Sequence, residues 1–196
     1  MLPPGAITRN FLPYVRKLDS RSLDAVDLIV IHCTELPDLA EAREFGERIH
    51  YKDSLTGNSG HYYIGRNGMI EQWVPMNRVA HHVKNFNEKS LGIELVNIGR
   101  YPHWFDSGNQ VMTEPYPQAQ ILSLIALLND LEERFPALQR ISGHSSLDKT
   151  RLPASDRPEL LICRKQDPGL LFPWQQVLSR VRMEWYEPTQ DQESGQ

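Results

Sequence analysis

Short apolar runs alternate along the chain with longer amphipathic stretches. Residues 27–33 form a brief, β-branched run without helical periodicity, which favours a buried strand over a helix. In residues 90–97 every second position from Leu91 to Leu95 is leucine or isoleucine, so that Glu94 emerges from the opposite face of the predicted strand. These two segments predict the core of a sheet.

A hairpin is predicted around Asn67-Gly68, the dipeptide best suited to a tight turn with positive φ angles. Its arms are residues 61–66 and 69–74. A further short apolar segment, residues 141–144, ends at glycine and histidine. The chain therefore carries several short strands, and two of them are followed or ended by a histidine.

Helical spacing of apolar residues predicts three helices, at 37–52, 117–135 and 173–186. The second is the most regular and is broken by Pro136. The polar tail at 187–196 is expected to be disordered.

Strands separated by helices, with one antiparallel hairpin, predict an α/β fold with a central mixed β-sheet flanked by helices. The chain has 196 residues and is 40% hydrophobic, enough for one core of ordinary size. We expect a single domain over residues 1–186, with its core at 28–174.

The formal net charge of −4 lacks the basic excess that nucleic-acid binding requires, so nucleic acid is excluded as a partner. Cys33 and Cys163 are too few for a disulfide framework or a thiolate metal cage, and they fit a reducing compartment. Residues 1–19 contain no continuous apolar stretch, and no later segment has the length of a membrane span. We expect a cytoplasmic monomer without membrane insertion, although delivery to the cell wall by a non-Sec route remains open.

Candidate chemistry gathers at the ends of predicted strands. Catalytic zinc takes three ligands from His, Asp, Glu and Cys and leaves a fourth position for water. His32 and His144 each end a short apolar segment, and two strand ends can converge on one metal. Asp167 lies in an Asp-Pro-Gly turn that would present its carboxylate rigidly. From the residues alone, hydrogen-bonded core histidines and an ordinary turn explain the same pattern.

Six motifs in a fixed order change that balance. They are residues 30–34 (Val-Ile-His-Cys-Thr), 59–68 (Ser-Gly-His-Tyr-Tyr-Ile-Gly-Arg-Asn-Gly), 80–82 (Ala-His-His), 90–97 (Ser-Leu-Gly-Ile-Glu-Leu-Val-Asn), 143–145 (Gly-His-Ser) and 164–169 (Arg-Lys-Gln-Asp-Pro-Gly). In this order they resemble the type-2 N-acetylmuramoyl-L-alanine amidases, a family that includes AmpD-like bacterial enzymes, phage lysozyme-type amidases and peptidoglycan recognition proteins. The resemblance covers residues 28–174.

The resemblance implies a role for each of five residues. His32, His144 and Asp167 would hold one Zn²⁺ ion, with aspartate as the last ligand as in the AmpD-like branch. Glu94 would be the catalytic acid and base, and Lys165 would stabilise the developing oxyanion. Surface charges without a catalytic role are the alternative for Glu94 and Lys165.

The resemblance also suggests substrate contacts, for which we name His82, His61, Arg66 and Trp104. A structural role is an alternative for His61. Trp104 belongs to an aromatic-rich loop at 97–117 that is suited either to packing on sugar faces or to anchoring the loop. Residues 146–163 make the spacing between the last two ligands longer than is usual in the family, and we expect this insertion to shape access to the metal.

The function implied is hydrolysis of the amide bond between N-acetylmuramic acid, or its 1,6-anhydro form, and L-alanine in peptidoglycan or muropeptides. Such an enzyme would serve cell wall recycling or lysis. Two other functions stay open: a non-catalytic peptidoglycan-binding module, and a zinc hydrolase acting on another amide.

Overall fold

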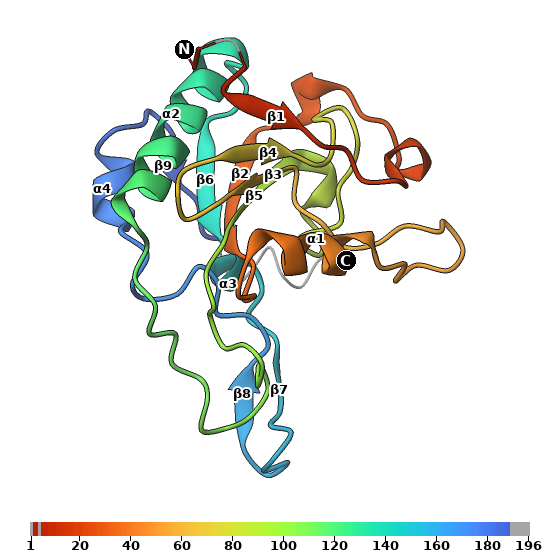
Figure 1. Cartoon of the computed structure of the whole chain (residues 1–196), viewed down its shortest axis with the longest axis vertical. Helices are drawn as coiled ribbons and strands as arrows, with labels where there is room; N and C mark the ends of the chain where they lie inside the picture. Colours follow the sequence, from red (N-terminus) through yellow and green to blue (C-terminus); the bar gives the residue numbers. More distant parts are fainter. Residues whose placement is uncertain (1, 4, 189–196) are drawn as a thin grey trace.

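A seven-stranded sheet runs through the centre of the molecule (Figure 1). The computed structural model describes residues 2–3 and 5–188. In spatial order the strands are β1 (Ile7–Arg9), β4 (Ile70–Gln72), β3 (Tyr62–Ile64), β5 (Ser90–Leu95), β2 (Leu28–Cys33), β6 (Arg140–Gly143) and β9 (Glu184–Trp185). The β3–β4 hairpin is antiparallel, and the other pairings of this sheet are parallel, which confirms the mixed sheet.

Strand β2 lies between β5 and β6, and all six of its residues are buried. A parallel strand that is covered on both faces needs apolar side chains on both, which explains the continuous apolar run. Ile29 and Ile31 point into one core cluster, whereas Leu28 and Val30 belong to another on the opposite face. His32 follows Val30 on that second face.

One face of the sheet packs against α2 (Gln118–Arg134). Leu124 and Leu128 of the helix are completely buried in the same cluster as Ile93 of β5. Gln120 donates hydrogen bonds to the carbonyl oxygens of Ile64 and Val96, at 2.8 and 3.0 Å, and so fixes the helix against the ends of two strands. Among the described residues, no helix is both long enough and apolar enough to span a bilayer.

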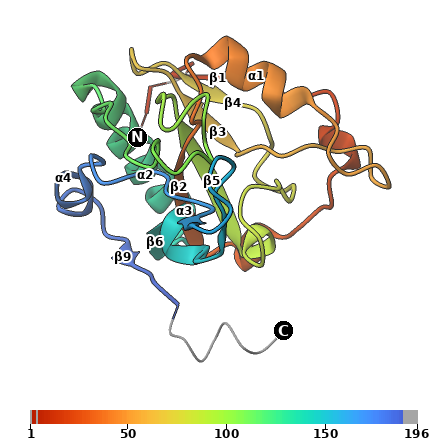
Figure 2. The ribbon, with the colours of Figure 1, turned by 90° about the horizontal axis from the view of Figure 1, so that it is seen from below.

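The opposite face is covered by α1 (Leu39–Glu47), by α3 (His144–Leu147) and by loops (Figure 2). Asp38 caps α1 by accepting a hydrogen bond from the backbone N–H of Glu41. Trp73 lies beneath this helix, stacked on Tyr63 with ring centroids 3.4 Å apart. The remaining helices are α4 (Trp174–Leu178) and three short 3-10 helices, η1 (Val15–Lys17), η2 (Leu23–Ala25) and η3 (Asn87–Lys89).

Two predicted helices are shorter in the structure. The helix expected at 37–52 ends at Glu47, after which a bridge between Tyr51 and Thr56 shapes a projecting loop. The helix expected at 173–186 is wrong in its second half, because β9 instead pairs in parallel with β6. That pairing uses backbone groups of β6 that a helix would leave without partners. Of the tail expected to be disordered, residues 189–196 lie outside the described part of the chain.

The insertion at 146–163 folds into a hairpin of its own, formed by β7 (Arg151–Pro153) and β8 (Leu161–Cys163), which projects from the body of the molecule (Figure 1). The long loop that follows β5 runs beside it. Ser107 donates two hydrogen bonds to Asp156, at 2.6 and 2.8 Å, and the N–H of Ser155 donates to the carbonyl of Phe105. The insertion and this loop therefore form one wall.

Candidate metal centre

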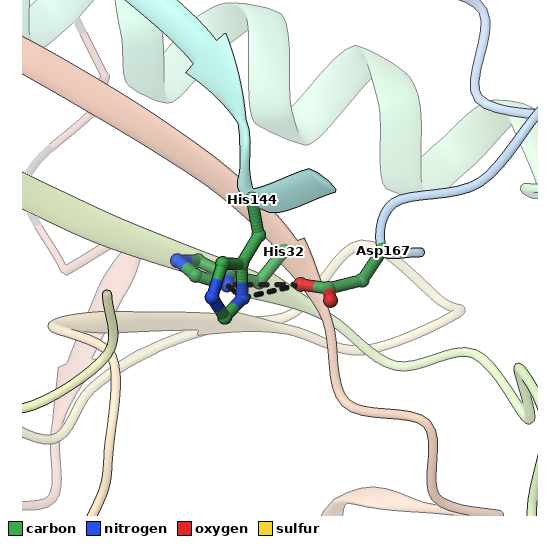
Figure 3. A group of neighbouring side chains, drawn as sticks. All are labelled: His32, His144 and Asp167. Atoms are coloured by element: carbon green, nitrogen blue, oxygen red, sulfur yellow. Dashed lines mark hydrogen bonds and ion pairs between the residues drawn. The ribbon is translucent and has the colours of Figure 1, made fainter. Parts of the chain in front are cut away.

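Three side chains from distant parts of the sequence meet at one edge of the sheet (Figure 3). His32 lies near the end of β2, and His144 follows β6 directly. The two strands are parallel, with Ile31 beside Gly143, so their carboxyl ends reach the same edge. Asp167 comes from the turn after β8, where the N–H of Ser145 donates to its carbonyl oxygen. The structure thus brings together the three residues that the sequence nominated.

The three donor atoms form a nearly equilateral triangle. The distances are 3.0 Å between the Nδ1 atoms of His32 and His144, and 3.0 and 3.1 Å from these atoms to Oδ2 of Asp167. All three side chains are buried. Tetrahedral zinc ligands at about 2.0–2.1 Å lie about 3.3 Å from one another, so the triangle fits such an ion with little adjustment. Oδ1 of Asp167 and Nε2 of His144 have no hydrogen-bond partner among the described residues.

The protonation states also suit a metal. Burial lowers the pKa of His32 to about 4, although its hydrogen bond to Asp167 opposes that shift. For Asp167, burial alone would raise the pKa, but the two neighbouring histidines hold it well below its usual range. At neutral pH the pair therefore presents a free imidazole lone pair and a carboxylate, the forms that bind metals.

Behind His32 lies a directional chain of hydrogen bonds. Nε2 of His32 is 3.0 Å from Nδ1 of His82, and Nε2 of His82 is 3.3 Å from the Ser90 hydroxyl. That hydroxyl donates to the carbonyl oxygen of Phe86 at 2.7 Å. If Nδ1 of His32 faces a metal, its Nε2–H donates to His82, and His82 in turn donates to Ser90. Every donor in the chain then has an acceptor.

Gly92 makes room for this arrangement, because a Cβ atom there would lie 2.7 Å from the His82 ring. Ser90, Gly92 and Glu94 share one face of β5. Ser90 contacts His82, Gly92 leaves room for the His82 ring, and Glu94 lines the cleft. The Gly-Ile-Glu motif therefore has a steric reason as well as a chemical one.

Glu94 lies beside His32 in the β2–β5 register, on the face away from α2. Burial raises the pKa of Glu94 to about 8, the charge of Asp167 adds to this shift, and Lys165 opposes it. Gly60 leaves space for the carboxyl side chain, since a Cβ there would approach Cγ of Glu94 to 2.9 Å. Lys165 lines the same cleft as Glu94 and Asp167. The structure thus gathers all five predicted catalytic and metal-binding residues.

A cleft of about 1030 Å³ opens over these residues. Its lining residues include Tyr51, Asn58 and His81, and the Tyr51 hydroxyl donates a hydrogen bond to Asn58. Others come from the wall formed by the insertion and its neighbouring loop. They include Trp104, Phe105, Thr150 and Arg164. The volume of the cleft lies at the upper end of the range that is usual for small-molecule sites.

The four predicted substrate contacts separate into two pairs. His82 and Trp104 line the cleft. His61 is fully buried behind it, where Nδ1 accepts a hydrogen bond from the N–H of Gly92. Arg66 lies outside the cleft lining and binds both carboxylate oxygens of Glu114, at 2.6 and 3.0 Å. The geometry gives His61 and Arg66 structural positions in place of substrate contacts.

Sequence reasoning missed two groups around the centre. The carboxylate of Asp148 lies 4.0 Å from Nε2 of His144 and also pairs with Arg164. Glu35 and Arg100 form a buried ion pair next to the segment that carries Asp167. Arg100 lies in an irregular loop 65 residues from Glu35, and no periodicity or motif marked either one.

The sequence of this chain is similar to those of known proteins. Residues 22–170 match the family model described as N-acetylmuramoyl-L-alanine amidase. The chain is 32% identical to the 1,6-anhydro-N-acetylmuramyl-L-alanine amidase AmpD of Haemophilus influenzae over 134 residues, 63% of this chain and 59% of that protein. It is 31% identical to the N-acetylmuramoyl-L-alanine amidase AmiD of Escherichia coli over 142 residues, 65% of this chain and 46% of that protein. It thus spans roughly half the length of these curated relatives.

A solved structure of E. coli AmiD shares the fold, with a TM-score of 0.61 and 25% sequence identity. The match covers 85% of this chain and 61% of the AmiD chain. That structure is a complex with the substrate anhydro-N-acetylmuramic acid-L-Ala-D-gamma-Glu-L-Lys.

Proposed function

The chain belongs to the N-acetylmuramoyl-L-alanine amidase family, and from that premise we propose that it hydrolyses the amide bond between N-acetylmuramic acid and L-alanine. The sugar is proposed to be either the ordinary or the 1,6-anhydro form. One observation carries the proposal: His32, His144 and Asp167 present three converging donor atoms at the floor of a cleft that Glu94 and Lys165 also line. The names of AmpD and AmiD and the substrate in the AmiD complex support the choice of bond.

We propose zinc as the metal. Two imidazoles and one carboxylate with a fourth position open are a donor set typical of catalytic zinc. When bound in such a site, zinc lowers the pKa of a coordinated water from about 15.7 toward 7 and polarises a carbonyl group.

Glu94 is the proposed acid and base. Its carboxyl group would accept the proton of the attacking water and deliver a proton to the leaving nitrogen of L-alanine. A carboxyl group whose pKa is raised to about 8 in the metal-free site can hold a proton near neutral pH, and a neighbouring cation would make it easier to release. Lys165 would hold its positive charge beside the developing oxyanion, a contribution of about 3 kcal/mol for one donor.

His82 is proposed to act on His32, with any substrate contact secondary. Its Nδ1 lies 3.0 Å from Nε2 of His32 and would accept a hydrogen bond from it, and the backbone N–H of His82 donates to the side chain of Asn87 at 3.0 Å. Fixing the Nε2–H tautomer of His32 keeps Nδ1 free for a metal. Trp104 remains a proposed substrate contact because it lines the cleft.

We propose that residues 1–186 form one catalytic domain. Both β1 near the start and β9 near the end pair into the central sheet, which supports that extent. Peptidoglycan fragments are the proposed partners. The cytoplasmic location stays a prediction that cell fractionation would test.

A non-catalytic binding module is the main alternative. Binding alone would not require a half-buried carboxyl group beside three converging metal donors, so the position of Glu94 favours hydrolysis. A zinc hydrolase acting on another amide would use the same metal centre, but a different substrate would fit its cleft.

The test is incubation of the purified protein with anhydro-muropeptides and, separately, with intact sacculi, with and without a chelator. Mass spectrometry should find free stem peptides that begin with L-alanine, and the chelator should abolish them. A Glu94→Gln variant should bind zinc as the wild type does and release little peptide. Absence of released peptide from both substrates would refute the proposal, and zinc-independent binding of sacculi would favour the binding module.

A further inference from the structure

Residues 163–167, the segment that includes Lys165 and Asp167, follow the projecting hairpin and belong to no regular element beyond its last residue. Asp167 nevertheless lies against His32 and His144, which the central sheet positions. We propose that Glu35, Arg100 and Gln110 form a brace that positions this segment, which makes Arg100 a positioning residue for the metal centre. The inference rests on the proposed metal site and adds to it the residues that hold its loop-borne half.

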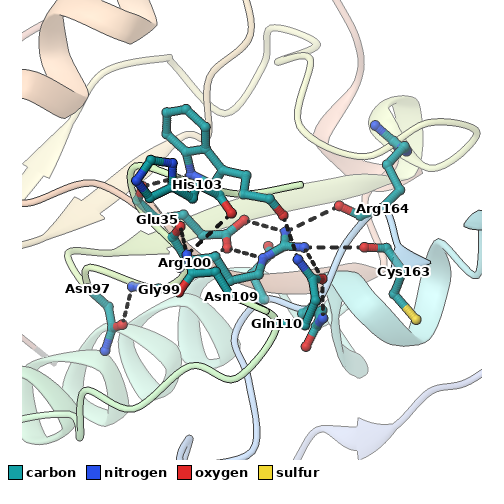
Figure 4. Close-up of polar contacts among 12 residues, drawn as sticks. Glu35, Asn97, Gly99, Arg100, His103, Asn109, Gln110, Cys163 and Arg164 are labelled. Carbon is teal, nitrogen blue, oxygen red and sulfur yellow. Dashed lines mark hydrogen bonds and ion pairs between the residues drawn. The ribbon is translucent and has the colours of Figure 1, made fainter. Parts of the chain in front are cut away.

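Arg100 is 1% exposed and uses all of its guanidinium donor groups (Figure 4). Nε and Nη2 donate to the two carboxylate oxygens of Glu35 at 2.6 and 2.8 Å. The other donors reach the carbonyl oxygens of Cys163 and Arg164 and the side-chain oxygen of Gln110, each at 3.2 Å. The planar fork of arginine can serve these partners at once, whereas a lysine ammonium cannot.

The other end of the brace is fixed close to the sheet. Glu35 follows β2 by two residues and adopts a positive φ of 50°. Its carbonyl oxygen accepts from Nε1 of Trp104 at 3.1 Å, and a side chain on Gly99 would collide with it, since a Cβ there would lie 2.6 Å from Cγ of Glu35. These contacts fix the position of the Glu35 side chain, three residues after His32.

A second arm runs through Gln110. Its side-chain oxygen accepts from Nε2 of Gln166 at 2.8 Å as well as from Arg100. Its amide group donates to the carbonyl oxygens of Trp104 and Asp106, at 3.0 and 2.8 Å. Gln110 is thus held from both ends.

The brace contacts the segment at three positions. The carbonyl groups of Cys163 and Arg164 and the side chain of Gln166 face the brace. Lys165 and Asp167 instead line the cleft. Backbone hydrogen bonds hold both ends of this segment, from the N–H of Ser145 to the carbonyl oxygen of Asp167 and from the N–H of Arg164 to that of Thr150. The brace adds side-chain contacts between these two points.

A purely structural ion pair would stabilise the fold without affecting the metal, and three variants separate the two roles. Arg100→Lys keeps the charge but loses the fork. Glu35→Gln with Arg100→Met removes both charges together, so no buried charge is left unpaired if the single variant folds poorly. The matched control is Glu114→Ala, which removes another carboxylate that holds the same loop. Its carboxylate binds Arg66 and the N–H of Ile98, and its hydrogen bonds and ion pairs among the described residues include none with residues 163–167.

The measurements are the zinc dissociation constant by competition with a chromophoric chelator, hydrogen–deuterium exchange of peptides covering 159–172 in the metal-free protein, and kcat and KM on an anhydro-muropeptide. Both brace variants should bind zinc about tenfold more weakly and exchange faster in that region, with the loss of activity in kcat and not in KM. Glu114→Ala should lower thermal stability and leave zinc affinity and kcat unchanged.

Unchanged zinc affinity and exchange in both brace variants would overturn the proposal. An equal loss in the Glu114→Ala control would do so too, because the effect would then be general destabilisation of the loop. A wild-type protein that binds no zinc would instead refute the proposed metal site, while the exchange experiment on metal-free protein would still decide the brace.

Discussion

The two halves of the candidate metal centre are held in different ways. His32 and His144 lie at the ends of neighbouring parallel strands, where the backbone hydrogen bonds of the sheet fix their positions. Lys165 and Asp167 lie in an irregular segment after a projecting hairpin, where side chains such as Arg100 add to a few backbone hydrogen bonds. The strand-borne half therefore depends on the fold as a whole, whereas the loop-borne half depends on a few named residues.

Removing a strand-borne ligand should have the largest effect. The His144→Ala variant should lose zinc and all measurable turnover, since changes to residues behind a ligand already cost about 10- to 100-fold in affinity and losing the ligand costs more. Metal analysis and peptide release measured by mass spectrometry would check this. A variant with stoichiometric zinc would show that His144 is not a ligand.

Lys165→Met tests the loop-borne half without removing a ligand. Methionine keeps much of the side-chain length and loses the charge, so we expect kcat to fall about 100-fold with zinc content unchanged. Steady-state kinetics beside metal analysis would measure both. Loss of zinc in this variant would mean that Lys165 supports the metal segment and has no separate role in turnover.

His82 tests how much support the strand-borne half needs beyond the sheet. His82→Ala should weaken zinc binding about tenfold, because His32 loses the acceptor for its Nε2–H. His82→Gln should restore part of the affinity, since an amide can accept from His32 and donate to Ser90. Chelator competition would compare the two, and equal affinities would remove His82 from the support of the metal.

The last expected effect concerns the stability of the metal-free protein and its dependence on pH. Because the pKa of Glu94 is raised from 4.5 to about 8, the folded metal-free protein keeps a proton that the unfolded chain releases. The stabilisation that this proton gives the folded protein is fully present below about pH 4.5 and is lost as pH rises toward 8. Thermal unfolding of metal-free wild type and Glu94→Gln across this range should diverge, with the wild type losing relative stability as pH rises. Parallel curves would mean that Glu94 ionises as an ordinary carboxyl group.

The same contrast explains what the sequence could predict. The strands that carry His32 and Glu94 were predictable from neighbouring residues alone, because the first is a continuous apolar run and the second alternates apolar residues at every second position. The position of β9 was not, since a helical stripe at Val177 and Val181 continues into Trp185, and only pairing with β6 reveals a strand there. The positions of His61 and Arg66 were equally hidden. Motif position cannot distinguish a side chain that lines a cleft from one that is buried behind it, as His61 is, or paired with a carboxylate outside it, as Arg66 is.

The sequence by itself determined the main strands around the site, the long helix, the family, and the five residues that the family resemblance proposes for chemistry. Those features follow from local periodicity and from motifs whose order survives in one dimension. Only the tertiary structure decided that the three donor atoms lie about 3 Å apart, that Gly92 admits His82, and that Arg100 joins Glu35 to the segment before Asp167. Each of these depends on contacts between residues far apart in the chain, which no local pattern of amino acids encodes.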